Sequence, residues 1–223
     1  MARQYRHKGD DKSYKTTSKY RDLHIPVQYA VIVDESHPFG LYSAMSFTAI
    51  ILAAGKGTRM ISALPKALHR VGGHAMLAWS MDAARLAGAE RIVTVLAPGF
   101  EDIQDWLDGA PFAIQEDQLG TGNAVASARE AVGNEDGVAI VMFADTPLVS
   151  AASLKQLADG VKAGAGIVIA GFRPDDPSGY GRLVEDADGT ISRIVEDREC
   201  SPAERAIGPV SYTHLTLPTT YGV

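Results

Sequence analysis

Short apolar segments alternate with segments of helical periodicity between residues 47 and 172, and this alternation restricts the fold more than any other feature of the chain. Phe47–Leu52 and Val138–Phe143 are apolar runs rich in β-forming residues, whereas Ala75–Leu86 has the apolar spacing of a helix. Ser150 is a suitable N-cap for a further helix over residues 151–163. Strands separated by helices of about 10–13 residues form βαβ units. The pattern therefore predicts an α/β fold, a mostly parallel sheet with helices on both faces.

The same criteria predict the other elements of this region. Gly88 is a typical C-cap after the first helix. Leu183–Glu185 and Ile191–Val195 flank the pair Asp188-Gly189, which predicts an appended β-hairpin. Further strands are expected at Arg91–Leu96, Phe112–Ile114 and Ile167–Phe172, and further helices at Glu101–Leu107 and Gly122–Val132.

Composition and charge exclude several classes of protein. No apolar run approaches the ~20 residues that span a bilayer. The net charge of the 223 residues is −6, and the Lys and Arg residues are enriched ahead of residue 25, so the rest of the chain is more acidic still. An acidic body argues against binding to nucleic acid. Cys200 is the only cysteine, so no disulfide forms within the chain. We expect a cytoplasmic protein that contacts neither membranes nor nucleic acid.

Three segments of different character follow one another. Residues 1–44 have no regular period, and we interpret them as an extension upstream of a natural start at Met45, the alternative being a weakly ordered native tail. Residues 46–209 carry the α/β pattern and are expected to form the folded domain. Residues 210–223 break the pattern, and their sequence resembles the translation of a sequencing-library adapter, so we expect a non-native tail.

A glycine-rich loop follows Phe47–Leu52, at the edge where open α/β sheets bind ligands. Lys56, Arg59 and Lys66 supply cations for a polyphosphate. The loop fits neither a P-loop nor a dinucleotide fingerprint, because Gly57 follows Lys56 and Met60 occupies the last glycine position. The alternative is a glycine-rich turn with surface cations. Small residues give an anion access to backbone N–H groups here, namely Ala53, Ala54, Gly55 and Gly57.

Two further loops carry residues suited to nucleotide chemistry. Gln115 precedes Gly120, Thr121 and Gly122 at the start of a predicted helix, and a glutamine amide can both donate to and accept from a nucleobase edge. An N-cap turn with Thr121 as the cap explains the same residues equally well. Asp145 follows a buried strand, where a carboxylate can hold Mg²⁺ beside substrate phosphates. A turn-forming aspartate is the alternative there.

Taken together, these loops resemble a known family. The string from Leu52 to Met60, followed by Leu64-Pro-Lys-Ala-Leu-His69, is similar to the nucleotidyltransferase domain of the bifunctional UDP-N-acetylglucosamine pyrophosphorylase/glucosamine-1-phosphate N-acetyltransferase family. The resemblance covers about residues 46–209 and implies a Rossmann-like nucleotidyltransferase fold. Ala144 departs from the glycine that the family usually has before its aspartate, which questions the backbone conformation at that point.

The resemblance also implies roles for individual residues. Arg59 and Lys66 would act in catalysis, on the leaving pyrophosphate and on the phosphate under attack. Asp145 would bind Mg²⁺. Gly181 and Glu196 would contact the sugar, although a glycine-rich turn and an exposed hairpin carboxylate are equally good descriptions of them. The expected nucleotide and substrate contacts are Leu52, Ala53, Ala54, Gly55, Lys66, Gln115, Gly120, Thr121, Phe143, Ala144, Asp145, Gly181 and Glu196.

The activity implied by the resemblance is the formation of UDP-N-acetylglucosamine and pyrophosphate from UTP and N-acetylglucosamine-1-phosphate, which feeds peptidoglycan and lipopolysaccharide synthesis. The family continues with an Asn-Thr-Gly segment after the position of Ile207, a second metal-binding asparagine and a trimer-forming acetyltransferase domain, none of which the sequence contains. We therefore expect this chain to be weakly active or inactive by itself.

Other functions remain open at this point. A related cytidylyl- or thymidylyltransferase would use the same scaffold, although the loop from Gln115 to Gly122 and the pair Leu68-His69 argue against it. A regulatory nucleotide-binding domain would not need Asp145 together with Lys66. A dinucleotide-dependent oxidoreductase is disfavoured because the glycine fingerprint is missing.

Overall fold

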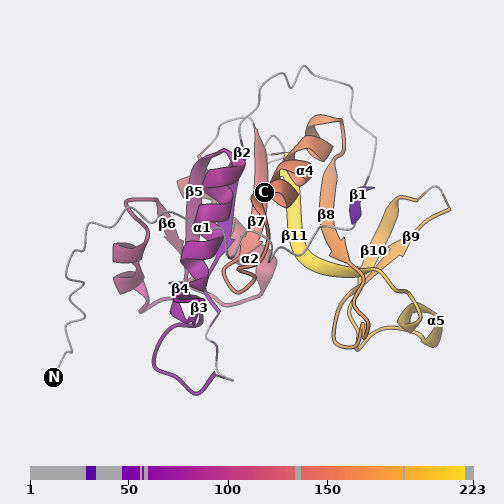
Figure 1. The fold of residues 1–223 in the computed structure, drawn as a ribbon, viewed down its shortest axis with the longest axis horizontal. Helices are drawn as coiled ribbons and strands as arrows, with labels where there is room; N and C mark the ends of the chain where they lie inside the picture. The colour runs from indigo at the N-terminus through magenta and orange to yellow at the C-terminus, as the bar shows by residue number, and fades with distance from the viewer. Residues whose placement is uncertain are drawn as a thin grey trace.

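The computed structural model describes residues 29–33, 47–55, 57, 60–133, 137–187 and 189–218. Arg59 and Lys56, and all of residues 1–44 except the strand at 29–33, lie outside these ranges. The described residues form one large sheet with helices on both sides and a smaller hairpin lobe at one end (Figure 1). Within these ranges, no helix combines the length and apolar character that crossing a membrane requires.

The sheet has the strand order β1-β8-β11-β7-β2-β5-β6. β2 pairs in parallel with β7 and β5, and β5 pairs in parallel with β6. β11 is antiparallel to both β7 and β8, so β7 and β8 run in the same direction. β1 is antiparallel to β8 at the edge. The strands are β1 (Tyr29–Val33), β2 (Phe47–Leu52), β5 (Ala89–Leu96), β6 (Phe112–Ile114), β7 (Val138–Phe143), β8 (Ile167–Phe172) and β11 (Val210–Pro218).

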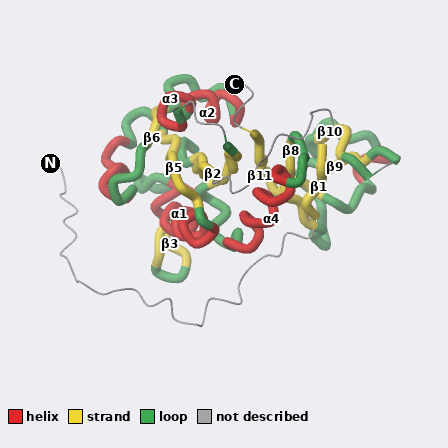
Figure 2. The backbone as a smooth tube through the Cα atoms, turned by 90° about the horizontal axis from the view of Figure 1, so that it is seen from above, coloured by secondary structure: helices red, strands yellow, loops and turns green. Residues whose placement is uncertain are grey.

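Helices cover both faces of the sheet, as Figure 2 shows. α1 (Met76–Ala87) and α4 (Ala151–Lys162) lie on one face. α2 (Thr121–Ser127) and α3 (Arg129–Val132) lie on the other. Alternation along β2 produces the two cores, because Ala49 and Ile51 pack with the first pair of helices and Ile50 and Leu52 pack with α2. The predicted α/β fold, mostly parallel and covered on both faces, is confirmed.

The ends of the long helices follow local rules. α1 ends at Gly88, whose φ of 93° is accessible to glycine without strain and whose N–H donates to Ala84 and Arg85 carbonyls. α4 begins after Ser150, whose hydroxyl accepts a hydrogen bond from the N–H of Ser153. Both predicted caps are therefore confirmed.

Three predictions about helices need correction. The segment expected as one helix over 122–132 is divided at Ala128 into α2 and α3. The interpretation of Thr121 as an N-cap is wrong, because Gly120 is the cap at a φ of 105° and Thr121 is the first helical residue. The segment after Pro98-Gly99 is a 3₁₀ helix, η4 (Glu101–Trp106), rather than an α-helix.

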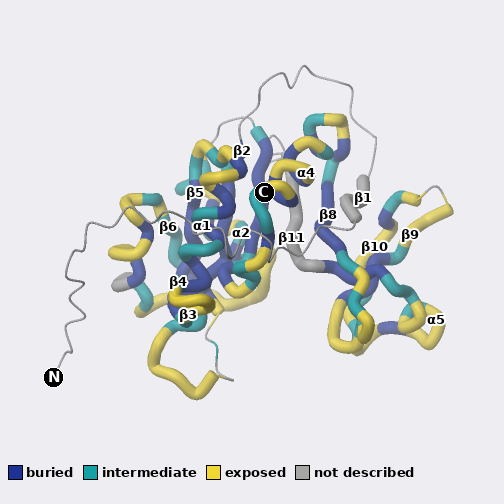
Figure 3. The backbone as a smooth tube through the Cα atoms, viewed as in Figure 1, coloured by how far each residue is buried: buried dark blue, intermediate teal, exposed yellow. Residues whose placement is uncertain are grey.

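The hairpin lobe consists of β9 (Arg182–Glu185), β10 (Ile191–Val195) and α5 (Pro202–Arg205). β9 and β10 are antiparallel, which confirms the predicted hairpin. The lobe joins the sheet through Val210 of β11, which pairs with Arg182. Much of the lobe is exposed, whereas β2 and β7 are buried (Figure 3). The sequence analysis did not predict α5, β1, β11 or the short elements η3 (Lys66–Leu68), β3 (Arg70–Val71) and β4 (His74–Ala75).

β11 occupies a central position in the sheet although we expected residues 210–223 to be a non-native tail. Backbone N–H and C=O groups bond to neighbouring strands irrespective of the side chains, so a strand here does not reveal where the segment originates. The adapter origin of this segment, like the start at Met45, stays a prediction.

Candidate active site

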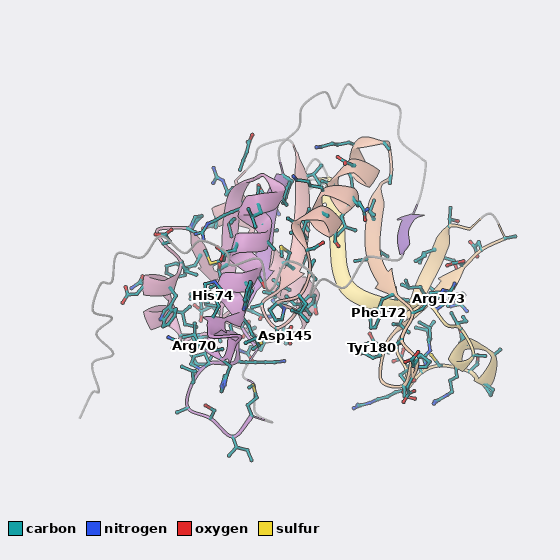
Figure 4. All side chains as sticks on the ribbon, in the orientation of Figure 1. Arg70, His74, Asp145, Phe172, Arg173 and Tyr180 are labelled. Atoms are coloured by element: carbon teal, nitrogen blue, oxygen red, sulfur yellow. The ribbon has the colours of Figure 1, made fainter. Side chains whose placement is uncertain are left out.

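A cavity of about 500 Å³ opens where β2 and β7 end, at the carboxyl edge of the parallel strands. Figure 4 marks Asp145 at this position. Eleven of the thirteen predicted contact residues line the cavity: Leu52, Ala53, Ala54, Gly55, Lys66, Gln115, Gly120, Thr121, Phe143, Ala144 and Asp145. Parallel pairing brings these loops together because it aligns the strand ends that carry them.

Backbone hydrogen bonds join the strand ends at the cavity. The N–H of Ala53 donates to the carbonyl of Val95 at 2.8 Å, and the N–H of Ala144 donates to the carbonyl of Leu52 at 3.1 Å. Ala144 is buried, and it is not among the residues with positive φ. An alanine therefore fits where the family usually has glycine, and the doubt about the local backbone is removed.

Gly57 lies directly against Lys66. Its φ is 57°, in the left-handed region that favours glycine, and an added Cβ would lie 2.8 Å from the Cβ of Lys66. A larger residue would therefore displace either the glycine-rich loop or the lysine. The glycine-rich loop therefore packs against Lys66, which is the first residue of η3.

Lys66 and Asp145 form an ion pair across the cavity, although 79 residues separate them in the sequence. Their side chains are 38% and 36% exposed, so both charges remain accessible to a ligand. The pair places one cation and one carboxylate at the point where the loops after β2 and β7 meet. The sequence analysis predicted both residues for this site but did not predict that they contact each other.

The residues present fit a magnesium ion that is held largely by its substrate. Asp145 is the only carboxylate among the described residues that line the cavity. The described ranges contain no group of three or more His, Cys, Asp or Glu side chains arranged for a metal. Mg²⁺ is commonly bound through one or two carboxylates plus substrate phosphates and water, so a single accessible carboxylate suits that ion better than an all-protein site would.

Gln115 is buried beside the cavity, at 5% exposure, and its side-chain amide is tightly held. Its Nε2 donates to the carbonyl of Gly120 at 3.0 Å and to Oδ1 of Asn123 at 2.9 Å. Its backbone N–H donates to Leu96 at the end of β5. These bonds fix both the loop and the orientation of the amide.

The sequence analysis missed several residues of the cavity. Gln118 donates from Nε2 to the carbonyl of Ala54 at 3.2 Å and so links the second loop to the glycine-rich loop. The sequence did contain a signal for Gln118, since it is a second amide side chain in the loop that begins at Gln115. The other missed lining residues are Met60, Ala67 and Ala124. Their apolar side chains resemble ordinary core residues in a sequence, so no signal distinguished them.

Gly181 and Glu196 do not line this cavity. They lie next to each other in the hairpin lobe, where a Cβ on Gly181 would be 3.6 Å from Oε1 of Glu196. Figure 4 shows Phe172 and Tyr180 together at the base of the lobe, with ring centroids 5.1 Å apart and an edge-to-face angle of 89°. The sugar contacts assigned to Gly181 and Glu196 remain predictions, as does the role of Arg59, which lies outside the described residues.

Comparison with known proteins decides the family. Residues 49–188, well over half of the chain, match the model of the MobA-like NTP transferase domain. The chain belongs to the MobA-like NTP transferase domain family. The matched range includes β2, the cavity and Asp145, so the region with family similarity is the region that builds the site.

The curated relatives agree with the resemblance noted in the sequence. The chain is 45% identical over 176 residues to the bifunctional protein GlmU of Maricaulis maris, which covers 78% of this chain and 39% of that protein. It is 44% identical over 167 residues to the bifunctional protein GlmU of Trichlorobacter lovleyi, covering 73% and 36%. The chain thus spans less than two fifths of the length of these relatives, and the resemblance to the nucleotidyltransferase domain of this family is confirmed.

Solved structures support the fold. A UDP-glucose pyrophosphorylase complexed with UDP-glucose aligns with a TM-score of 0.63 at 19% identity, over 78% of this chain and 76% of the other. A candidate glucose-1-phosphate thymidylyltransferase from Bacillus anthracis aligns with a TM-score of 0.65 at 19% identity, over 78% and 72%. At this level of identity the alignments establish a nucleotidyltransferase fold.

Proposed function

We propose that the chain carries the site for transfer of a uridylyl group from UTP to N-acetylglucosamine-1-phosphate. An oxygen of the sugar phosphate attacks the α-phosphorus of UTP, the bond between the α-phosphorus and the bridging oxygen breaks, and pyrophosphate leaves. The observation that carries the proposal is the Lys66–Asp145 pair in a cavity at the carboxyl edge of the sheet, in a chain 45% identical to a GlmU protein over 176 residues.

The cavity supplies binding and charge rather than a nucleophile. Backbone groups from Leu52 to Gly55 would bind the nucleotide, and Lys66 would stabilise negative charge on the α-phosphate. Gln115, Gly120 and Thr121 would contact uracil. Arg59 would contact the leaving pyrophosphate, and Gly181 and Glu196 would contact the sugar. The reaction needs positioning of two phosphates, which a preorganised cavity provides.

Asp145 would hold Mg²⁺, which when bound neutralises part of the charge of the nucleotide phosphates. Because the ammonium group of Lys66 contacts the carboxylate of Asp145, it would exchange this carboxylate for a phosphate of the bound substrate. The positive charge of Lys66 would be paired with an anion before and after this exchange, first the carboxylate and then the phosphate.

Two measurements on the full chain test the proposal. Isothermal titration with UTP and Mg²⁺ measures binding, and chromatography of long incubations with N-acetylglucosamine-1-phosphate or glucose-1-phosphate detects any sugar nucleotide. We expect UTP to bind and the N-acetylated sugar to be the preferred acceptor. Binding of another nucleotide in place of UTP would overturn the substrate, and no nucleotide binding at all would overturn the proposal. Asp145→Asn is the matched control for the role of Mg²⁺, since it keeps the shape of the side chain and removes the negative charge that would hold the ion.

A further inference from the structure

We propose that Asn123 is a positioning residue that makes the cavity select a nucleobase with an N3–H group. The inference rests on the proposed function, because it assigns the Gln115 side of the cavity to the base. It adds a residue that does not itself line the cavity and that acts through Gln115.

The orientation of the Gln115 amide follows from its partners. Nε2 lies 3.0 Å from the carbonyl oxygen of Gly120, and a carbonyl oxygen can only accept a hydrogen bond. Rotating the amide by 180° would place Oε1 against that carbonyl oxygen with no hydrogen between them. The second hydrogen on Nε2 is taken by Oδ1 of Asn123 at 2.9 Å. Both donors of the amide are therefore used within the protein.

The oxygen of the same amide, Oε1, remains available to a ligand. Gln115 is 5% exposed and lines the cavity, and Oε1 has no hydrogen-bond partner among the described residues. Oε1 is not one of the fully buried, unpaired side-chain atoms of the described residues. Because Gln115 lines the cavity, a ligand that donates a hydrogen bond can reach this oxygen. The side chain presents an acceptor alone to the cavity, although a free glutamine could present either group.

This polarity discriminates between pyrimidines. Uracil carries a hydrogen on N3, whereas N3 of cytosine has a lone pair and would face Oε1 with like polarity. Placing an acceptor instead of a donor opposite Oε1 leaves both acceptors without a hydrogen bond, and such mismatches discriminate more strongly than missing apolar contacts do. Asn123 keeps the selection in place because, without its Oδ1, one hydrogen of Nε2 becomes free and the amide has less reason to hold its orientation.

The test compares nucleotide selectivity in variants of the full chain. Affinities for UTP, CTP and N3-methyl-UTP are measured with Mg²⁺ for the wild type, Asn123→Leu and Asn123→Asp. We expect the wild type to prefer UTP over both others. Asn123→Leu should reduce that preference about tenfold, the effect of one hydrogen bond. Asn123→Asp retains an acceptor at the same place and should keep most of the preference.

Controls separate positioning from a structural effect. Ser127→Ala removes a hydrogen bond from Oγ to the Asn123 carbonyl at 2.9 Å, so it perturbs α2 without touching Gln115, and it should leave the preference unchanged. Asn123→Ala replaces the leucine variant if that variant does not fold, as judged by its thermal midpoint. An equal loss of affinity for all three nucleotides in the Asn123 variants would overturn the inference while leaving UTP as the substrate. Failure of the wild type to bind any of the three would overturn the proposed function as well.

Discussion

Replacing Lys66 by methionine should separate function from stability more cleanly than any other change in this chain. The Lys66–Asp145 pair joins two loops, so its loss could in principle loosen the fold. Both side chains are more than a third exposed, however, and ion pairs of that exposure contribute about 0.2–1 kcal/mol. We therefore expect the free energy of unfolding to fall by less than ~1 kcal/mol.

The expected effect on the ligand is larger. A hydrogen bond from a charged group is worth about 1.5–3 kcal/mol, which corresponds to a roughly 10- to 150-fold weaker affinity for UTP. Urea denaturation gives the stability, and titration calorimetry with Mg²⁺ gives the UTP affinity.

Lys162→Met is the matched control for this experiment. Lys162 also pairs with an aspartate, with its Nζ 3.7 Å from Oδ1 of Asp159, but it lies on α4 and does not line the cavity. It should show a similarly small change in stability and no change in UTP affinity. The reasoning is refuted if Lys66→Met binds UTP within twofold of the wild type, or if its unfolding free energy drops by more than ~2 kcal/mol.

Three other changes test separate parts of the structure. Gly57→Ala should weaken UTP affinity about tenfold in calorimetry, because its Cβ would meet Lys66, and unchanged affinity would contradict the contact. A left-handed alanine costs about 1–2 kcal/mol, so the free energy of unfolding from urea denaturation should fall by up to that amount. Ser150→Ala should lower the free energy of unfolding by about 1 kcal/mol without affecting UTP, and an equal loss of affinity would show that the cap does more than stabilise α4. Hydrogen bonds from the Ser201 side chain, from Arg193 and from the Ser201 backbone together lower the pKa of Glu204 to about 2, so their stabilising effect is complete above the ordinary glutamate pKa and is lost as the pH falls toward 2. In Ser201→Ala the pKa of Glu204, followed by NMR titration, should rise toward its ordinary value, and a constant pKa would assign the shift to another group.

Most of the secondary structure could be predicted because it depends on local signals. β2, β6, β7 and β8 begin and end at the predicted residues. For β2, β7 and β8 the reason is that continuous apolar runs identify strands buried on both faces. The short elements were missed because two-residue strands and single helical turns carry too few residues to show a period.

The position of β11 could not be predicted from local signals. Its segment has neither the apolar run nor the flanking helices of the other strands, and its place between β7 and β8 depends on pairing with strands more than 35 residues away in sequence. A single sequence specifies such long-range pairing only weakly.

By itself, the sequence determined the fold class, the loops that carry the chemistry and the two charged residues Lys66 and Asp145, because residue type and spacing are local properties. Only the tertiary structure decided that these two side chains meet, that Gly181 and Glu196 lie away from the cavity, and that the amide of Gln115 donates a hydrogen bond to Asn123. Each of these is a relation between side chains from different loops or turns, and it exists only when strand pairing and helix packing have brought those atoms within a few ångströms of one another.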